Sequence, residues 1–586
     1  MLWEESALAD KVTGADIEEL SLKELREIVR KLQELLSEEQ KQKFQEIVRE
    51  CRENDEKEDL QPVPARMSQE LIEEKLEQIQ IWQKQIDEGD LYLDTEEYED
   101  YSNGYWDADW ITEYYDNQGI GEKLMYMIRF AEDCVEDRRY AEANGIYEWL
   151  WEMEVSTDSE FGDSAGIEEL AENRLIHTDM KRLALLTLYA DYQALPPERR
   201  AEDMYLYFSS DTFAKLHVEE MFHVGREKLK DTDRFWSDWI ALLKEKNGDV
   251  EARLLKEAVL YYKGADGLLE MAEENASVHP SLYLAVMAEY EKGHSCEKIE
   301  EVGKKALEKI DVAFTIRGEI ALKAAFFASR FGHEEEMMRF CWECFLSDTT
   351  VKNYLRLFGT KKMAEQYGMR GKEVLKSTVT GNSGNNWRNS ELQRNIVDDY
   401  EYYSLAFFTG DFEMVKKRSK NPKGSLGWST SFISVGIRLF LIYLYEKPLP
   451  SKAAARIAAE VGFPDTEDGN ARLDFERAIQ EECSARKMSE FWNYFQKWKG
   501  YFPMEEAERE KYLIWAEKIV SERADAIVSG QHRNQYGQVA ALLAVVGEIK
   551  ESMGTHGAAR EIWTRYKGRF PRHSSFQKEM RDYFNM

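Results

Sequence analysis

Apolar residues recur along most of this chain at the 3.6-residue period of an amphipathic helix. Residues 124–135 carry one apolar stripe, a short charged turn follows, and residues 143–150 carry the next stripe. Two such helices joined by a short turn form a helical hairpin. Further pairs of stripes meet at short turns near Gly293, Gly332, Gly410 and Gly554. The pattern therefore predicts a succession of helical hairpins.

Long runs of alternating apolar and polar residues, which would indicate strands, do not occur in the sequence. The 11 prolines in 586 residues leave room for many uninterrupted helices. The last pair of stripes covers residues 539–553 and 559–570, and Pro571 is expected to end the final helix. We therefore expect an all-α fold, namely an irregular α-solenoid of stacked helical hairpins with an N-terminal helical module.

The N-terminal part is expected to be a separate module. Residues 1–52 contain two stretches that begin with the Ser-x-x-Glu/Gln spacing of a helix capping box. Residues 53–66 are charged, lack an apolar stripe and contain two prolines, as is typical of a linker. The predicted organisation is a helical module at 1–52, a charged linker at 53–66, a helix at 68–87 within a region 67–121, and two helical-repeat arrays at 122–380 and 381–586.

Two resemblances support this fold. The segments RRYAEANGIYEWLW at 138–151, FFTGDFEMV at 407–415 and MGTHGAAREIWTRYKGRFP at 553–571 resemble the turn and second helix of tetratricopeptide-type repeats. Their spacing departs from the regular period of about 34 residues, so the resemblance implies degenerate repeats. Residues 532–554, HRNQYGQVAALLAVVGEIKESMG, are similar to the helical tail of bacterial SWIM-type zinc-finger proteins. The Cys-x-Cys and Cys-x-His motif of that family does not occur, so this likeness implies a helical fold and no metal site.

Length and composition agree with a large folded protein. A single core stops growing at roughly 250 to 300 residues, so a chain of 586 residues implies several domains or one repeat array. The N-terminus lacks the basic and apolar regions of a secretory signal. The longest apolar run, residues 432–445, is shorter than the roughly 20 residues that span a bilayer, so a buried helix is expected there. Six scattered cysteines fit a reducing compartment, so we expect a cytoplasmic protein without a membrane contact.

Charge is unevenly distributed along the chain. The net charge is −34, and residues 1–150 alone carry 41 acidic and 17 basic side chains. Residues 351–424 have the opposite balance, with 14 basic and 8 acidic side chains. An acidic surface repels the phosphate backbone, so general nucleic-acid binding is disfavoured and only the basic stretch leaves it open.

The most unusual segment covers residues 90–116, where eight aromatic and ten acidic residues occur with neither a helical nor a strand period. Its aromatic groups are of the kind favoured at interfaces, and its carboxylates suit a basic partner. It is therefore either a recognition segment or a strap whose aromatic side chains pack into grooves between helices. The candidate partner-binding residues are Tyr98, Tyr101, Tyr105, Trp106, Asp107, Asp109, Trp110, Tyr114 and Tyr115.

A basic run follows one of the predicted hairpins. The candidate basic patch consists of Lys416, Lys417, Arg418, Lys420, Lys423 and Trp428, with Trp387 and Arg388 upstream. Clustered cations beside an aromatic ring suit a single nucleic-acid strand or an acidic peptide. A solvated helix end explains the same run without any ligand. A contact with the acidic N-terminal region, within the chain or in a dimer, is a third alternative.

Motifs for catalysis or cofactor binding are not evident. The sequence has no phosphate-binding loop, HExxH or GxSxG motif. Cys341 and Cys344 form one CxxC, but a structural zinc site needs four ligands, so core packing is the better interpretation. Glu220 and His223 have the Glu-x-x-His spacing, but a helical di-iron site needs two such motifs and two further carboxylates on facing helices, so a structural histidine is the better interpretation. We therefore assign no catalytic, cofactor-binding or metal-binding residue.

These patterns favour a non-catalytic scaffold or adaptor that presents helical repeats to a protein or peptide partner. An effector enzyme with dispersed catalytic residues is an alternative, and it predicts a concave pocket with converging carboxylates or a perturbed titrating group. A further alternative is an accessory protein of a nucleic-acid-linked bacterial defence or regulatory system. The sequence leaves the oligomeric state open.

Overall fold

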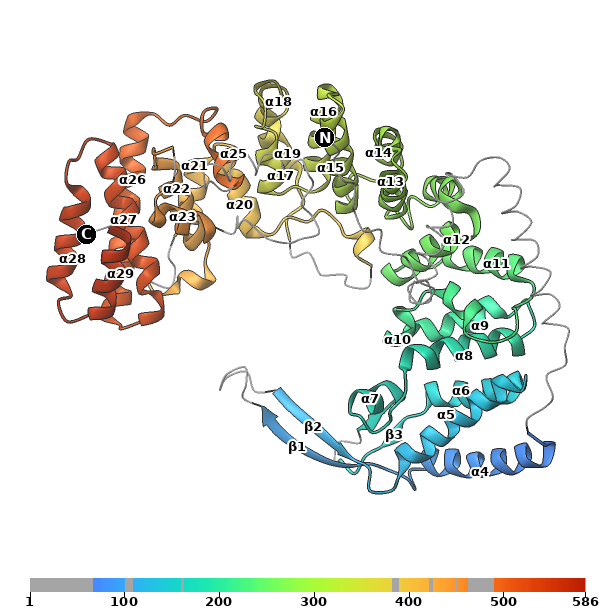
Figure 1. Ribbon diagram of the computed structural model, residues 1–586. Coiled ribbons are helices and arrows are strands. Elements are labelled where there is room, and N and C mark those ends of the chain that lie inside the picture. The colour runs from blue at the N-terminus through green and yellow to red at the C-terminus, as the bar shows by residue number, and fades with distance from the viewer. Residues whose placement is uncertain are drawn as a thin grey trace, which may run out of the picture. The chain divides into compact units, whose positions relative to one another are not determined.

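The computed structural model describes residues 67–100, 109–159, 163–381, 389–420, 425–448, 450–461 and 490–584. The chain divides into two compact units, unit 1 up to Thr232 and unit 2 from Asp233 (Figure 1). This boundary lies inside the range 122–380 that the sequence pattern treats as one array. The predicted module at 1–52 and the linker at 53–66 lie outside the described residues.

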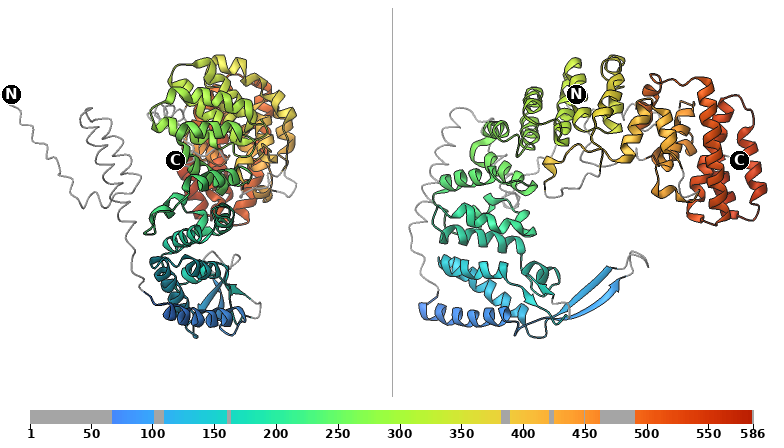
Figure 2. Two further views of the ribbon diagram at one scale, coloured as in Figure 1. Left: turned by 90° about the vertical axis from the view of Figure 1, so that its right-hand side faces the viewer. Right: turned by 180° about the vertical axis from the view of Figure 1, so that it is seen from behind.

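Unit 1 contains helices and two small two-stranded sheets. Its helices are α4 (Gln69–Asp87), α5 (Ile120–Glu136), α6 (Tyr140–Glu152), α7 (Ile167–Glu172), α8 (Met180–Ala194), α9 (Arg200–Leu206), α10 (Asp211–Ala214) and the 3-10 helices η1 (Tyr207–Ser209) and η2 (Val218–His223). Its antiparallel strand pairs are β1 (Asp94–Asp100) with β2 (Asp109–Tyr115) and β3 (Val155–Ser156) with β4 (Ser164–Ala165). Helices α5, α6 and α8 pack side by side, as both views of Figure 2 show.

Local sequence signals explain the beginnings and turns of these helices. Ser68 is the N-cap of α4 and its hydroxyl oxygen accepts a hydrogen bond from the Leu71 amide at 3.3 Å, which confirms the helix predicted at 68–87. The predicted hairpin at 124–150 is also confirmed, as α5 and α6. Arg138 closes its turn with a φ of 62°, a left-handed conformation that ends a helix tightly.

In its described residues, unit 2 consists of helices joined by turns and loops, with isolated β-bridges but no strand pair. Its helices are α11 (Thr232–Lys244), α12 (Asp249–Glu274), α13 (Leu282–Lys292), α14 (Ile299–Lys309), α15 (Thr315–Arg330), α16 (Glu334–Ser347), α17 (Val351–Arg356), α18 (Lys361–Gln366), α19 (Gly371–Ser377), α20 (Asp399–Phe408), α21 (Phe412–Arg418), α22 (Ile433–Leu444), α23 (Lys452–Ala459), α25 (Glu490–Lys499), α26 (Glu506–Ser529), α27 (Tyr536–Ser552), α28 (Ala558–Arg569) and α29 (Ser574–Phe584). Short 3-10 turns lie between some of them. Successive helices from α12 to α16 pack on their neighbours in sequence order.

The predicted hairpin turns of unit 2 occur where expected, with one local difference. Gly332, Gly410 and Gly554 adopt positive φ values of 76°, 83° and 94°, which glycine reaches without a steric penalty. Gly293 keeps a negative φ, and its neighbour His294 takes the left-handed conformation with a φ of 55°. The turn therefore closes one residue later than the glycine suggests.

The C-terminal prediction was wrong in one respect. Pro571 ends α28 near Arg569, but a further helix, α29, follows from Ser574 to Phe584 and packs on α27 through Phe576 and Met580, which are both buried. The apolar run at 432–445 forms α22, a buried helix as predicted. Within the described residues, every helix is too short or too polar to reach across a bilayer.

An aromatic core organises the middle of unit 2. Phe407 and Phe408 at the end of α20 pack against Trp498 of α25, with ring centroids 5.9 and 4.8 Å away. Phe440 and Tyr443 of α22 contact Phe407 at 5.2 and 6.1 Å. Helices that are distant in sequence therefore share one core. In the described part of the chain the sheets are small and the rest is helix and loop, which confirms the all-α prediction.

Candidate functional site

Within the acidic and aromatic segment, the described residues Asp94–Asp100 and Asp109–Tyr115 form an antiparallel strand pair, which we call the β1–β2 hairpin, so the expectation that the segment has no strand period was wrong there. Strands β1 and β2 pair in a register that places Glu96 opposite Glu113 and Tyr98 opposite Ile111. Alternate residues of a strand point to the same face, so Glu96, Tyr98, Glu113 and Tyr115 share one face. The run Trp-Ile-Thr-Glu-Tyr-Tyr in β2 has high strand propensity and was the available signal.

Two candidate aromatic residues of the hairpin face water. Tyr98 and Tyr115 are 44% and 41% exposed, so they do not pack into a groove between helices. Both phenols donate hydrogen bonds to Glu113, at 3.0 and 2.9 Å. The bond to Glu113 raises the pKa of Tyr115 to about 12. Glu96 and Glu113 carry like charges directly opposite each other in the strand pair, so they would repel each other. The hydrogen bonds from the two phenols to Glu113 offset part of this repulsion.

The opposite face anchors the hairpin to unit 1. The phenol of Tyr114 donates a hydrogen bond to Glu169 of α7 at 2.5 Å, and burial raises the pKa of Tyr114 to about 12. The amide of Thr95 donates to Asp158 at 2.8 Å. Among the other candidate residues, Tyr101, Tyr105, Trp106 and Asp107 lie outside the described residues, and only the backbone of Asp109 and Trp110 is described, in β2.

The basic run lies at the end of α21, where its charges divide into two groups. Arg418 pairs with Asp399 of α20 and its guanidinium lies 5.3 Å from the centroid of the Tyr403 ring. No carboxylate of the described residues pairs with Lys417 or Lys420. Cations are favourable in the last turn of a helix, and Asp411 caps the start of this one. The upstream residues Trp387 and Arg388, and Lys423 within the run, lie outside the described residues.

Trp428 does not belong to this surface, so its assignment to the basic patch was wrong. The ring is only 2% exposed, and the guanidinium of Arg523 lies 5.1 Å from its centroid. Arg523 is itself buried and donates to the Ser425 carbonyl at 2.7 Å. Trp428 therefore packs in the core of unit 2 and cannot stack on a ligand.

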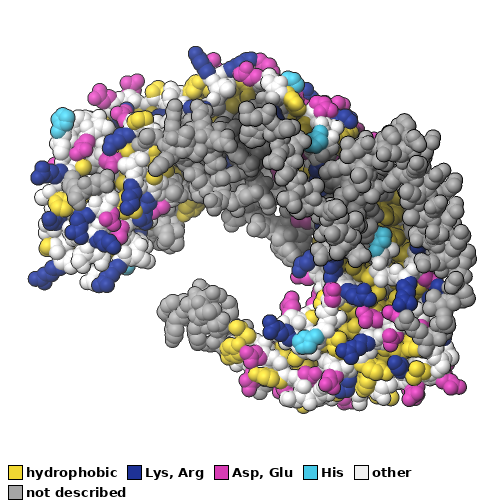
Figure 3. Space-filling model, viewed as in Figure 1, with side chains coloured by type: hydrophobic (Ala, Val, Ile, Leu, Met, Phe, Trp, Pro, Cys, Tyr) yellow, Lys and Arg dark blue, Asp and Glu magenta, His cyan; other side chains and the backbone are white. Residues whose placement is uncertain are grey.

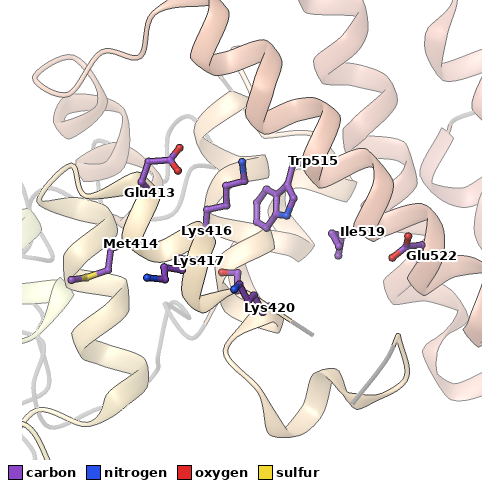
Figure 4. A pocket seen from close by; sticks show the side chains of 9 residues that line it. Glu413, Met414, Lys416, Lys417, Lys420, Trp515, Ile519 and Glu522 are labelled. Carbon is purple, nitrogen blue, oxygen red and sulfur yellow. The ribbon is translucent and has the colours of Figure 1, made fainter. Parts of the chain in front are cut away.

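A different tryptophan stands beside the lysines. Lys416 of α21 lies over the rings of Tyr512 and Trp515 of α26, at 5.4 and 5.9 Å from their centroids. Figure 4 shows the Lys416 side chain alongside the Trp515 ring, between the two helices. Trp515 was missed because nearly one hundred residues separate it from the basic run and its local pattern is that of an ordinary helix.

These residues enclose an open pocket of about 770 Å³, which we call the basic pocket (Figure 4). It is lined by Glu413, Met414, Lys416, Lys417, Ser419, Lys420, Trp515, Ile519 and Glu522. Its two carboxylates already have partners within unit 2. Glu413 pairs with Lys511 and Tyr512, which lowers its pKa, and Glu522 lies 3.9 Å from Lys518. The pocket therefore offers two cations, Lys417 and Lys420, that no carboxylate of the described residues pairs with, beside aromatic and apolar side chains.

Part of the cationic surface of unit 2 is neutralised by neighbouring carboxylates. Lys and Arg side chains gather over the C-terminal helices on the face shown in Figure 3. On α28, however, Arg565 pairs with Glu561 at 3.5 Å and Arg569 pairs with Asp525 at 2.8 Å. In the basic pocket, by contrast, no carboxylate of the described residues pairs with Lys417 or Lys420, and both lysines line a concave surface.

A second hollow of unit 2 has a volume of about 960 Å³, and we call it the carboxylate cleft. Segment 389–398 forms one wall and is fastened to several helices. The Thr315 amide donates to the Gln393 carbonyl at 3.0 Å, and the Asn395 side-chain amide donates to the Thr349 hydroxyl at 2.8 Å. The carboxylate of Glu391 accepts a hydrogen bond from the Ser281 amide at 2.9 Å.

Several carboxylates of the carboxylate cleft have pKa values above their ordinary range. Burial raises the pKa of Glu401 to about 7, although Glu401 also accepts a hydrogen bond from the Val351 amide. Burial likewise raises the pKa values of Asp348 and Glu319. Lys352 and Arg394 line the same cleft. A concave pocket with converging carboxylates is the feature that the alternative of a dispersed active site predicts.

The remaining candidates from the sequence, Cys341, Cys344 and Glu220, have burial or ion pairs that explain them without a bound metal. Cys341 and Cys344 are 1% and 2% exposed, and burial raises the pKa of both thiols, to about 11 for Cys341. Raised thiol pKa values make a reactive or metal-binding thiolate unfavourable. Glu220 lies in η2 and pairs with Lys181 at 2.8 Å, a contact that needs no metal.

Comparison with known proteins gave no relative from which to carry over a role: no family model and no curated protein matches this chain. The geometry of the basic pocket and of the carboxylate cleft is therefore the basis for assigning function.

Proposed function

We propose that this protein is a non-catalytic scaffold whose basic pocket binds an acidic segment of a partner protein. The observation that carries the proposal is that Lys416, Lys417 and Lys420 line one open pocket with the half-buried ring of Trp515, while no carboxylate of the described residues pairs with Lys417 or Lys420. An aromatic ring beside cations accommodates an acidic chain that contains an aromatic residue, because ring stacking and charge pairing then act together. Met414 and Ile519 supply apolar contact area in the same pocket.

The architecture supports this proposal. Successive helices from α12 to α16 pack on their neighbours in order, a pattern that supports an irregular, tetratricopeptide-like α-solenoid, and such repeats commonly present grooves to peptides. The likeness of residues 532–554 to the tail of SWIM-type proteins concerns α27 and agrees with a helical repeat of this kind. We place the protein in the cytoplasm, and we interpret the exposed face of the β1–β2 hairpin as a further contact surface.

An acidic peptide fits the basic pocket better than nucleic acid does. The whole chain carries a net charge of −34, which repels a long polyanion beyond the few lysines of the pocket. Glu413 and Glu522 lie on the pocket wall itself. A short acidic segment with a tyrosine can avoid both carboxylates, whereas a phosphate backbone needs a continuous track of cations.

The double variant Lys417→Glu/Lys420→Glu is expected to weaken binding of an acidic, tyrosine-containing peptide by about tenfold or more at low ionic strength. The reason is that two attractive charges become repulsive at the centre of the pocket. Fluorescence anisotropy of a labelled peptide of alternating glutamates and tyrosines measures this loss. The matched control is Lys578→Glu/Arg581→Glu, which makes the same charge change at two exposed positions of α29.

Replacing the tyrosines of the peptide with alanines tests the part played by Trp515. We expect weaker binding of the alanine peptide to the wild type and no such difference in Trp515→Leu. The proposal would be contradicted if the wild type and Lys417→Glu/Lys420→Glu bound each peptide with the same affinity. Tighter binding of a labelled single DNA strand than of the peptide would favour the nucleic-acid alternative instead.

The carboxylate cleft favours a second candidate function, general acid–base hydrolysis. Glu401, with a pKa of about 7, has the protonation equilibrium that a proton donor needs near neutral pH, and Asp348 and Glu319 lie in the same cleft. Glu401→Gln keeps the hydrogen-bond acceptor for Val351 but removes the transferable proton.

If this second function holds, the wild type turns over at least one member of a panel of nitrophenyl glycosides, esters and phosphodiesters, and Glu401→Gln reduces its kcat by about 100-fold or more. Absorbance of released nitrophenol measures turnover. Thermal unfolding of the variant provides the control, because an unfolded variant would also lose activity. Absence of turnover by the wild type over the whole panel would count against an enzyme.

A further inference from the structure

A pocket in unit 1 has the opposite character to the basic pocket. It has a volume of about 550 Å³ and is bounded by residues of α6, α8, α9, η1 and α10. Its charged and amide side chains are those of Asn144, Glu148, Glu152, Asp191, Arg199 and Asp203. Four carboxylates and one guanidinium give this lining an excess of negative charge, and we call it the acidic pocket.

Asp191 is the central residue of the acidic pocket. It lies in the middle of α8 among apolar residues and is only 3% exposed. Asn144 lies close enough to its carboxylate to lower the pKa, and Asp191 Oδ2 is buried without a hydrogen-bond partner among the described residues. Asn144 Oδ1 is also buried and without a partner. Two buried acceptors that lack donors are costly, because each has lost its hydrogen bonds to water.

The other carboxylates surround the same space. Burial raises the pKa of the Tyr207 phenol, and the charges of Asp191, Glu148, Glu152 and Asp203 raise it further. These carboxylates therefore lie within electrostatic range of one phenol ring. Arg199 compensates only part of this charge, because it pairs with Asp203 on its own helix at 2.6 Å.

Aromatic rings complete the wall. Tyr207 stacks on Phe213 with centroids 5.0 Å apart, and Trp151 meets the edge of Phe213 at 4.6 Å. The indole N–H of Trp151 donates to the Thr187 hydroxyl at 2.9 Å, which fixes the orientation of that ring. Rings that face a cation attract it through their negative π-surface.

The spacing of the carboxylates fits an organic cation better than a metal ion. A bound divalent ion needs several oxygen ligands close around it. Among the described residues, no three carboxylates of this pocket bring ligand atoms within 4.8 Å of one another. The carboxylates therefore surround a volume that is larger than a metal ion.

We infer that the acidic pocket binds a primary alkylammonium group, as on a lysine side chain or a small amine. The ammonium N–H groups donate to Asp191 Oδ2 and Asn144 Oδ1, Glu148 and Glu152 complement its charge, and the alkyl chain lies against Trp151 and Tyr207. A guanidinium is less suitable, because its planar fork prefers both oxygens of one carboxylate, whereas Asp191 offers a single buried oxygen without a partner among the described residues, Oδ2.

The full-length protein is titrated with n-butylammonium chloride at about pH 8, and binding is followed by saturation-transfer NMR. We expect wild type to bind and Asp191→Asn to bind about tenfold more weakly or worse, since the loss is that of a charge-assisted hydrogen bond. Glu202→Gln is the matched control, because Glu202 is exposed on α9 outside the pocket and should leave affinity unchanged. Sodium chloride at about 0.15 M suppresses binding to the general acidic surface.

Three further cations test which chemical features of the ligand the acidic pocket recognises. Tetramethylammonium lacks N–H donors and butylguanidinium has a planar fork, so both should bind more weakly than butylammonium, and magnesium should not displace it. Equal affinity of wild type and Asp191→Asn for butylammonium would overturn the inference, as would equal affinity of the wild type for tetramethylammonium. Displacement of butylammonium by stoichiometric magnesium would also overturn it.

A second variant keeps the inference testable if Asp191→Asn does not fold. Glu148→Gln/Glu152→Gln changes two exposed residues of α6 and leaves the core of α8 unchanged. Its affinity for butylammonium should fall about threefold or more at the same ionic strength, since two of four attracting charges are removed. Unchanged affinity in this variant would likewise overturn the inference.

Discussion

Asp191→Asn should stabilise unit 1 by up to about 4 kcal/mol at pH 8 and have almost no effect near pH 4. Burial raises the pKa of Asp191 from its ordinary value of 3.8 to about 7 in the folded protein. The folded state therefore favours the protonated carboxyl, and its advantage is complete below the unfolded pKa. That advantage is lost as the pH rises through about 7, where an unpaired charge is forced into the interior.

An isosteric amide carries no charge, so the variant should lose this pH dependence. Urea unfolding of wild type and variant at a series of pH values between 4 and 8 measures the difference, and comparison at each pH cancels the contributions of other carboxylates. Glu202→Gln, an exposed neighbour on α9, should leave the free energy of unfolding unchanged to within about 0.5 kcal/mol. A gap between wild type and Asp191→Asn that is constant over this range would show that the effect is not one of ionisation.

Replacement of Trp498 by alanine should destabilise unit 2 by about 3 to 5 kcal/mol. The indole is fully buried and lies 4.8, 5.4 and 5.4 Å from the ring centroids of Phe408, Phe495 and Phe502. Its N–H donates to the Phe408 carbonyl at 2.7 Å. Truncation leaves a cavity among aromatic rings that cannot collapse into it, and it also leaves a buried carbonyl without its donor.

Chemical denaturation followed by circular dichroism measures this loss as a lower midpoint of the transition that belongs to unit 2. Trp498→Phe should be intermediate, because it keeps an aromatic ring but not the N–H. Ile514→Ala on α26 is the control, since Ile514 is 62% exposed and its truncation should cost less than about 0.5 kcal/mol. A variant Trp498→Ala as stable as this control would show that the aromatic cluster does not hold α20, α22 and α25 together.

The β1–β2 hairpin shows why one element escaped prediction. A strand is recognised from sequence when one face is apolar and the other polar, but here the exposed face carries Tyr98 and Tyr115 together with carboxylates. Hydrogen bonds from the two phenols to Glu113 hold that face, instead of burial of apolar groups. The β-propensity of residues 110–115 was a usable signal, but the pairing itself depends on residues of a second strand.

The three pockets show a different reason why a site cannot be predicted fully from the sequence. A carboxylate among the apolar residues of α8 is a local anomaly, so Asp191 could have been noticed from sequence. That Asp191 Oδ2 lacks a hydrogen-bond partner among the described residues could not have been predicted from the sequence, because it depends on how Asn144 of a neighbouring helix lies. Similarly, the basic run was recognised at 416–420, but the run itself suggested Trp428 and not Trp515 as the adjacent ring.

The sequence by itself determined the helix at 68–87 and the helical hairpins at 124–150 and 539–570, because the apolar period and the capping residues act between positions only three or four apart. It also determined where charge accumulates and that the run at 432–445 is buried. The tertiary structure alone decided that Lys417 and Lys420 have no carboxylate partner among the described residues, that Trp515 lies beside Lys416, that segment 389–398 forms one wall of the carboxylate cleft and that Asp191 and Asn144 line one pocket. Those relations join residues tens to about a hundred positions apart, and their distances are set by helix packing, which the local pattern does not encode.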